Sequence, residues 1–201
     1  MSKNQKPLIM VKFHKEKSMK ELELILITPE RLESYKKDMQ EAFQYGYEIE
    51  YGKSEELILP EEHINQSLNA QNSFAYEAVI ENERVGGAIV NIRENNHSHL
   101  DFLFVKVGVQ SRGIGKSIWK NLEEMYPQTE VWETMTPYFE KRNIHFYVNN
   151  CGFHIVEYFN KYHVDRNNKD TENTQNNEFF EDEGGMFRFE KDMGKAIRKI
   201  K

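Results

Sequence analysis

The sequence predicts one mixed α/β domain in which about four helices flank a central, mostly antiparallel sheet of about six to seven strands. Three observations predict this fold class. The chain has 201 residues, which suits a single domain with its own hydrophobic core. Apolar residues recur at every second position across residues 74–107, a pattern typical of antiparallel strands joined by short turns. On either side of this stretch they recur every three to four positions, as in helices.

The first expected elements are a short strand and a helix. Residues 22–27 are largely apolar and predict a strand, after which a threonine N-cap and Pro29 mark the start of a helix. This helix is expected to end near Gln44, and its buried face holds Leu32, Tyr35, Met39, Ala42 and Phe43. Residues 45–71 contain two glycines and then Pro60, so they predict a loop followed by a short helical stretch.

Strands and helices alternate along the rest of the chain. We expect strands at residues 74–80, 85–92, 100–107, 131–135 and 153–162, and helices at residues 118–126 and 139–149.

Two segments fall outside this pattern. Residues 1–20 mix short apolar pieces with lysines and predict a flexible N-terminal extension, ahead of one domain over residues 21–201. Residues 165–185 are rich in asparagine and acidic residues and predict a mobile acidic loop before a last strand at 186–190.

Charge and composition exclude several classes of protein. The chain holds 27 Lys and Arg against 33 Asp and Glu, a net charge of −6, which disfavours a nucleic-acid partner and suits a cationic one. No apolar run has the ~20 residues of a membrane span, and the N-terminal stretch lacks a signal-peptide core, so we expect a cytoplasmic protein without a membrane partner. A single cysteine, Cys151, excludes an internal disulfide and a cysteine-built metal cage.

The segment with the most chemical content joins a predicted strand to a predicted helix and reads Gln110-Ser111-Arg112-Gly113-Ile114-Gly115-Lys116. The two glycines let a ligand approach the backbone, and successive N–H groups at a helix start form a seat for phosphate oxygens. Arg112 and Lys116 add positive charge. A tight strand-to-helix turn without any ligand would explain the same residues equally well.

A nucleotide-binding P-loop is a further alternative, because Gly115-Lys116-Ser117 matches the end of that motif. The motif requires glycine where the chain has Gln110. It also belongs to a parallel βαβ unit, whereas here an antiparallel meander precedes the loop. The sequence therefore disfavours an NTPase.

Two segments carry a resemblance to a known family. Gln110-x-x-Gly113-x-Gly115, between a strand and a helix, resembles the acetyl-coenzyme A signature of the GNAT family of N-acetyltransferases. The segment from Asn143 through Tyr147 to a Gly-Phe pair at 152–153 is similar to the family's second signature. The spacing of the two signatures and the order of elements fit the family over residues 21–163 and 186–190.

The resemblance implies a GNAT-type sheet that is splayed at the acetyl-coenzyme A site. Backbone N–H groups of the glycine loop would bind the pyrophosphate, two strand residues would pair with pantetheine through their backbone, and Gly108 would mark a bulge. Acetyl-coenzyme A is the implied co-substrate and no metal is implied. The expected cofactor-binding residues are Val105, Val107, Gln110, Ser111, Arg112, Gly113, Ile114, Gly115, Lys116 and Asn143.

The resemblance also implies direct transfer of acetyl to an amine in a ternary complex, with Tyr147 as the general acid for the departing thiolate. Tyr147 stands five residues before Gly152, whereas four is the commonest family spacing. An extra residue in the helix end would restore its position; otherwise the ring would turn away and only pack. The acceptor would be a small-molecule or peptide amine. It would be cationic if the negative net charge of the chain guides it to the site. The sequence leaves open whether the protein forms a homodimer. The alternative is a catalytically silent coenzyme A-binding sensor or scaffold.

Candidate general bases follow from the need to deprotonate the amine before it attacks. His99 and Asp101 share one face of a strand, Glu133 lies in a neighbouring strand, and Glu48 and Glu50 fall in the expected loop after the first helix. We favour Asp101 and Glu133 as catalytic residues, although an ordinary solvated or salt-bridged side chain is the commoner role of each.

Other conspicuous residues have simpler explanations. His97-x-His99 offers two imidazoles but no third ligand at a defined spacing, so we expect no metal site. Cys151, Trp119 and Trp132 are expected to pack in the core.

Overall fold

The computed structural model describes residues 21–109, 113–164 and 185–194. The elements come in the predicted order, and their bounds are β1 (Glu23–Leu26), α1 (Pro29–Tyr51), α2 (Glu61–Asn69), β2 (Ser73–Ile80), β3 (Glu83–Asn91), β4 (His97–Val105), α3 (Ile114–Met125), β5 (Val131–Pro137), α4 (Lys141–His145), the π-helix η1 (Phe146–Cys151), β6 (His154–Phe159) and β7 (Met186–Asp192). The expected extension at 1–20 and all but the last residue of the expected loop at 165–185 lie outside the described residues.

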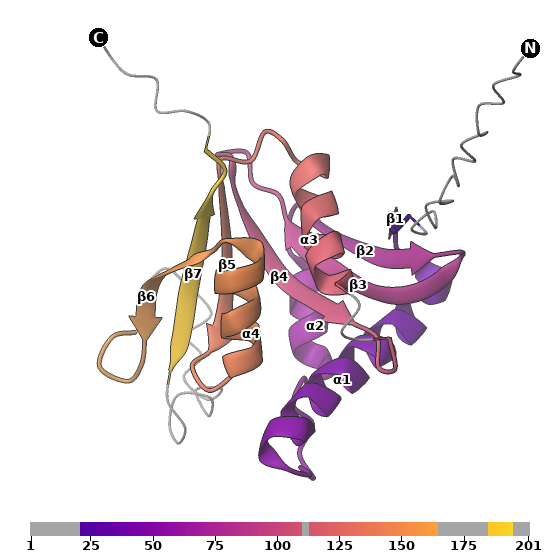
Figure 1. Cartoon of the computed structure of the whole chain (residues 1–201), viewed down its shortest axis with the longest axis horizontal. Coiled ribbons are helices and arrows are strands. Elements are labelled where there is room, and N and C mark those ends of the chain that lie inside the picture. Colours follow the sequence, from indigo (N-terminus) through magenta and orange to yellow (C-terminus); the bar gives the residue numbers. More distant parts are fainter. Residues whose placement is uncertain (1–20, 110–112, 165–184, 195–201) are drawn as a thin grey trace, which may run out of the picture.

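The seven strands form one open sheet in the order β1-β2-β3-β4-β5-β7-β6 (Figure 1). All neighbouring strands are antiparallel except β4 and β5. Those two are parallel because α3 carries the chain back between them. The predicted mixed α/β class, with its mostly antiparallel sheet, is confirmed.

The sheet opens between β4 and β5. Their pairing covers only His97–His99 against Val131–Glu133, although β4 continues to Val105 and β5 to Pro137. Beyond His99 the two strands diverge, as Figure 1 shows. The resemblance implied such a splayed sheet, and this gap is the feature that shapes the site.

Helices cover both faces of the sheet, and each face has its own core. The core between the sheet and the helices α3 and η1 contains Trp119, Trp132, Phe153, Phe189 and Cys151. The core between the sheet and the helices α1 and α2 contains Tyr35, Met39, Ile64, Ile89 and Phe104. The two tryptophan rings pack edge to face at 5.4 Å, so their predicted packing role and that of Cys151 are confirmed. Among the described helices, none combines the length and apolarity that crossing a membrane requires.

Helix α1 is longer than the sequence predicted. It continues past Gln44 to Tyr51, so Glu48 and Glu50 lie on a helix and not in a loop. Tertiary contacts explain the difference: Tyr47 and Tyr51 pack against Phe139, and the Tyr51 hydroxyl donates to the Phe139 carbonyl at 2.5 Å. Such contacts offset the helix-weakening Gly46, which local periodicity could not show.

The end of β4 also differs from the prediction. The register shift against β3 leaves Asp101 as the extra residue, so the bulge is at Asp101 and not at Gly108. β4 ends at Val105, and Val107 lies in the following turn, outside any strand. The strand predicted over residues 100–107 therefore ends two residues early, and Val107, an expected cofactor-binding residue, lies beyond it.

The C-terminal strands have shifted bounds and an order that the sequence did not show. β6 ends at Phe159 because a bridge between Asn160 and His163 turns the chain. β7 extends to Asp192 and lies between β5 and β6. This insertion brings Arg188 and Glu190 next to β5.

A thiol and a phenol buried in the core predict a lower free energy of unfolding at alkaline pH. Burial raises the pKa of Cys151 to about 12 and that of Tyr147 to about 12. The unfolded chain loses these protons first, so the stabilisation is present below the ordinary values of ~8.5 and ~10 and is lost as pH rises toward 12. We expect the free energy of unfolding from urea titrations to fall by roughly 1 kcal/mol per pH unit between about pH 9 and 10, and about twice as steeply above about pH 10.

Cys151→Ala is the control for this alkaline loss, because it removes the thiol whose ordinary pKa is the lower of the two. The fall should then begin nearer pH 10. A free energy of unfolding that stays constant from about pH 9 to 11 would contradict the prediction.

Candidate functional site

A cleft of about 970 Å³ begins at the gap between β4 and β5. Its walls come from the C-terminal half of α1, the end of β4, the start of α3, and α4 with η1. Because α1 covers one face of the sheet and α3 and η1 the other, the cleft passes through the gap from face to face.

The structure brings most of the described cofactor residues to this one cleft. The lining includes Val105, Gly113, Ile114, Gly115, Lys116, Asn143 and Tyr147. Val107 is not part of the lining, and Leu103 stands beside Val105 in its place. Gln110, Ser111 and Arg112 lie outside the described residues.

The two glycines at the start of α3 have different structural reasons. Gly113 is the N-cap residue, with a φ of 73° in the left-handed region that favours glycine. A Cβ on Gly115 would lie 3.2 Å from Cε2 of Phe146 and 3.5 Å from a methyl group of Val105. Gly115 therefore lets α3 approach η1 and β4.

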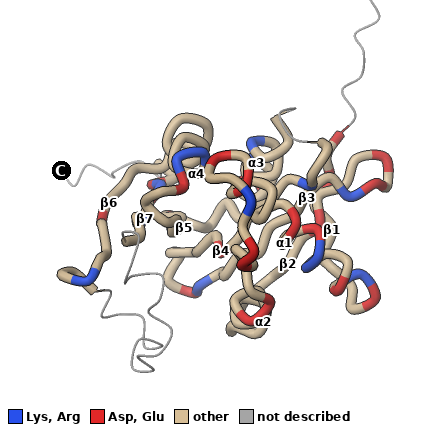
Figure 2. The backbone as a smooth tube through the Cα atoms, turned by 90° about the horizontal axis from the view of Figure 1, so that it is seen from below, with Lys and Arg blue, Asp and Glu red and all other residues tan. Residues whose placement is uncertain are grey.

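Positive side chains line the cleft from two helices. Lys116 comes from α3, while Lys141 and Arg142 open α4 directly after Glu140. Figure 2 shows blue and red segments of the backbone side by side at α4. A glycine-lined helix start with Lys116 beside it fits the phosphate groups of coenzyme A.

Tyr147 lies in the π-helix η1, which ends at Gly152 with a φ of 81°. A π-turn takes one more residue than an α-turn, so η1 accommodates the five-residue spacing. The ring packs on Phe153 and Phe189, with centroids 5.6 and 5.7 Å away, and still lines the cleft. The Tyr147 side chain therefore both lines the cleft and packs in the core.

Two threonines of β5 contact residues of α4 and η1. Thr134 donates to the carbonyl of Leu100 at 2.8 Å and so bridges β4 and β5 where they part. Burial raises the pKa of Tyr147, while a hydrogen bond with Thr134 opposes the rise. Asn143 donates to the Thr136 hydroxyl at 3.5 Å. Asn143 and Tyr147 therefore face the divergent part of the sheet.

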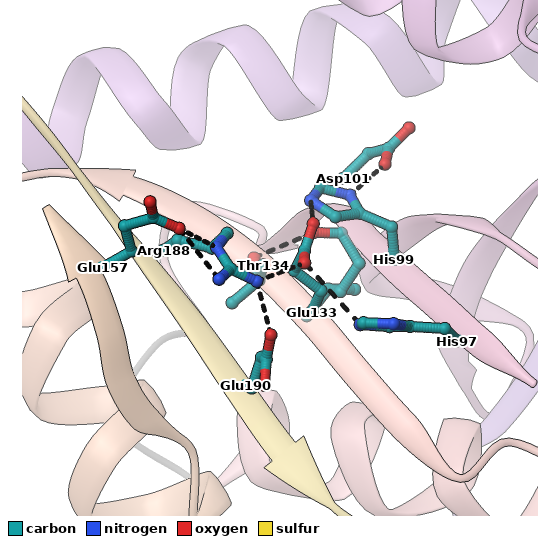
Figure 3. A network of polar contacts seen from close by, with 9 residues as sticks. His97, His99, Asp101, Glu133, Thr134, Glu157, Arg188 and Glu190 are labelled. Atoms are coloured by element: carbon teal, nitrogen blue, oxygen red, sulfur yellow. Dashed lines mark hydrogen bonds and ion pairs between the residues drawn. The ribbon is translucent and has the colours of Figure 1, made fainter. Parts of the chain in front are cut away.

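Asp101 and Glu133 lie outside the cleft lining and form part of a polar network (Figure 3). Asp101 pairs with Nδ1 of His99 at 2.5 Å. Glu133 accepts from Arg188 at 2.9 Å, and Arg188 also contacts Glu157 and Glu190. Both carboxylates that the sequence favoured as bases are thus already engaged by other side chains.

Three side chains of this network have the types that bind metals. Ligand atoms of His97, Glu133 and Glu190 lie within 4.8 Å of one another. However, the Arg188 guanidinium contacts both carboxylates and already supplies their positive charge. Sequence spacing could not find this group, because no local signal places β7 beside β5.

A carboxylate pair at the α1 end of the cleft was only half anticipated. Glu50 and Glu140 both line the cleft. Burial raises the pKa of Glu140, the charge of Glu50 raises it further, and Arg142 opposes the rise. Glu50 also lies 3.6 Å from the exposed Lys141. Two acidic and two basic side chains therefore meet at this end of the cleft, while Lys116 stands at the start of α3.

Two solved structures with this fold are named as N-acetyltransferases. The PaiA N-acetyltransferase of Thermoplasma acidophilum, in complex with coenzyme A, superposes with a TM-score of 0.60 at 19% identity, over 86% of this chain and 99% of that one. The spermidine N-acetyltransferase of Vibrio cholerae, in complex with coenzyme A and spermine, gives 0.58 at 13% identity, over 87% and 96%. The fold is therefore that of the N-acetyltransferase class.

Sequence comparison specifies the family. The model of the acetyltransferase (GNAT) family matches residues 32–153. An uncharacterized protein of Bacillus subtilis (strain 168), YrkN, is 45% identical over 134 residues, which are 66% of this chain and 72% of that protein. The chain belongs to the GNAT family and is an enzyme of the acyltransferase class.

Proposed function

We propose that the protein moves acetyl from acetyl-coenzyme A directly to an amine within a ternary complex. The observation that carries this proposal is the cleft that passes through the gap between β4 and β5. Such a passage lets a thioester and an amine meet from opposite faces of the sheet, with no acyl-enzyme needed. Cys151, the only cysteine, is buried with a raised pKa and does not suit a nucleophile.

In this proposal the start of α3 binds the pyrophosphate. Gly113 and Gly115 allow close backbone approach, and Lys116 adds a charged contact. Gln110, Ser111 and Arg112 complete the seat as predicted from the sequence. Pantetheine pairs with the backbone of β4 at Leu103 and Val105, which line the cleft where β5 has turned away.

The departing thiolate needs little stabilisation from side chains. The amine nitrogen attacks the thioester carbonyl carbon, the C–N bond forms, and the C–S bond breaks. Tyr147 holds its proton at neutral pH, because burial raises its pKa to about 12, and it donates a hydrogen bond to the departing sulfur. Asn143 contacts pantetheine from the same stretch of helix.

A cationic amine is the acceptor class that the cleft favours. Glu50 and Glu140 place two carboxylates at the α1 end, where Lys141 and Arg142 offset part of their charge. An amine with a second positive group would compensate the Glu50 and Glu140 pair while its reacting nitrogen enters the gap.

A thiol-release assay with acetyl-coenzyme A tests the proposed function. The acceptor panel comprises polyamines, amino acids, aminoglycosides and peptides, with mass spectrometry of the product. We expect release of coenzyme A with at least one amine, and N-acetylation of that amine. Tight coenzyme A binding without thiol release from any acceptor would instead support the silent sensor or scaffold.

Substitution of the two glycines tests the cofactor seat. Gly113→Val strains a left-handed residue, and Gly115→Val drives a side chain into Phe146 and Val105. Either change should weaken acetyl-coenzyme A binding about 10-fold or more, a loss of roughly 1.4 kcal/mol, by calorimetry. Gly52→Val, at the exposed end of α1 where a Cβ meets open space, is the control for backbone strain alone. Unchanged affinity in both α3 variants would exclude this seat.

A further inference from the structure

His99 occupies the point where β4 and β5 part. It stands opposite Glu133 in the last paired position of the two strands. The neighbouring residues Leu100 and Trp132 are buried in the core beneath α3. Because side chains alternate along a strand, His99 and Glu133 point to the opposite face, the one that α1 covers. His99 therefore lies at the closed end of the gap, on the side away from the α3 helix start, and is 17% exposed without being part of the cleft lining.

The imidazole is held in one orientation. Its Nδ1 lies 2.5 Å from Oδ1 of Asp101, and the two side chains are only 17% and 14% exposed. A carboxylate oxygen accepts but does not donate, so the proton of this hydrogen bond belongs to Nδ1. Nε2 then carries the lone pair, 3.9 Å from Oε1 of Glu133 and beyond hydrogen-bond distance.

The charges around the ring come from three strands. Asp101 and His97 lie on β4, Glu133 on β5, and behind Glu133 stand Arg188 and Glu190 on β7 (Figure 3). Arg188 holds the second oxygen of Glu133 at 2.9 Å, which leaves Oε1 directed toward the imidazole. A positive charge that appears on the ring would therefore have a carboxylate on either side.

We propose that His99 is the general base of the transfer reaction, with Asp101 and Glu133 as positioning residues. This assignment rests on the proposed function. Nε2 takes one proton from the acceptor ammonium group, and the free amine attacks the thioester carbonyl carbon. The nitrogen loses its second proton as the C–S bond breaks, so coenzyme A leaves as the thiol. The proton on His99 returns to solvent, and one proton is released per acetyl transferred.

The assignment makes the two carboxylates favoured by sequence reasoning indirect participants. Asp101 fixes the tautomer, so its loss should matter less than the loss of the ring itself. Glu133 is neutralised in part by Arg188 and stands too far from Nε2 to share its proton in the resting state. In other general-base pairs too, a carboxylate hydrogen-bonded to one ring nitrogen orients the histidine and fixes its tautomer.

The test compares His99→Gln with wild type in the thiol-release assay, using a primary alkylamine acceptor from the panel. We expect kcat/KM to fall by about 10²–10⁴-fold at pH 7. The deficit should shrink by about 10-fold per pH unit up to the ammonium pKa of ~10, because the free amine then needs no base. Imidazole should restore part of the activity of His99→Ala, and Asp101→Asn should lose less than His99→Gln.

His154→Gln is the matched control, because His154 is exposed on β6 and outside the cleft lining, and it should keep the wild-type pH profile. Calorimetry with acetyl-coenzyme A should give unchanged affinity for all variants, which separates this role from cofactor binding. Wild-type turnover with an unaltered pH profile in His99→Gln would overturn the base assignment and leave the proposed function standing. A wild-type protein that binds acetyl-coenzyme A but acetylates no amine would overturn both.

Discussion

Replacing Tyr147 by phenylalanine is expected to lower kcat by about 10²-fold without weakening the binding of acetyl-coenzyme A. The hydroxyl points to the gap beside Thr134, while the ring packs on Phe153 and Phe189 and stays in the variant. Its pKa of about 12 lies above the ~8.5 of a thiol, so the phenol serves as a hydrogen-bond donor to the sulfur more than as a complete proton donor. That difference limits the expected effect.

Turnover measured from pH 6 to 10 checks this prediction. Wild type should show no loss from Tyr147 ionisation in that range, because the hydroxyl keeps its proton. Tyr158→Phe on β6, outside the cleft lining, is the matched control and should leave kcat unchanged. If Tyr147→Phe turns over like wild type at every pH, Tyr147 is a packing residue and water protonates the thiolate.

Replacing Arg84 by methionine is expected to lower the free energy of unfolding by about 3–5 kcal/mol. The Arg84 side chain is 6% exposed and donates to Glu77, itself 2% exposed, at 2.9 Å. It also donates to Asp38 of α1 at 2.8 Å and lies over the Tyr35 ring. Its loss leaves Glu77 buried, with the partly exposed Arg31 as the one remaining ion-pair partner among the described residues, and it frees α1, a wall of the cleft.

Urea titration at pH 7 measures this effect, and a double variant tests its cause. Glu77→Leu combined with Arg84→Met removes both charges together, so it should recover much of the stability lost in the single variant. Lys120→Met, whose pair with Glu124 is exposed on α3, should change the free energy of unfolding by less than about 1 kcal/mol. A loss below about 1 kcal/mol in Arg84→Met would show that Arg31 alone neutralises Glu77.

Local patterns determined most of the elements and the cofactor end of the site. The alternation over 74–107 predicted β2, β3 and β4, which the structure confirms. The glycine motif predicted where α3 begins, because a left-handed residue and a close helix approach both require glycine. The Asn143 and Tyr147 signature predicted two residues that line the same cleft as Gly113 and Gly115. These features depend on short stretches of chain and can be predicted from them.

Helix ends and strand bounds were less accessible to sequence reasoning. α1 runs to Tyr51 because Tyr47 and Tyr51 pack on Phe139, far away in the sequence. The bulge at Asp101 depends on the register with β3, which no single strand encodes. For the same reason Val107 was assigned to a strand that ends at Val105.

The acceptor side of the site was decided by tertiary structure. The sequence offered Asp101 and Glu133 as separate carboxylates, but it could not show that one would pair with His99 and the other with Arg188. Arg188 reaches Glu133 only because β7, the last strand in sequence, inserts between β5 and β6. A side chain's partners depend on which strands become neighbours, and that choice is made by burial across the whole sheet and not by the residues adjacent in sequence.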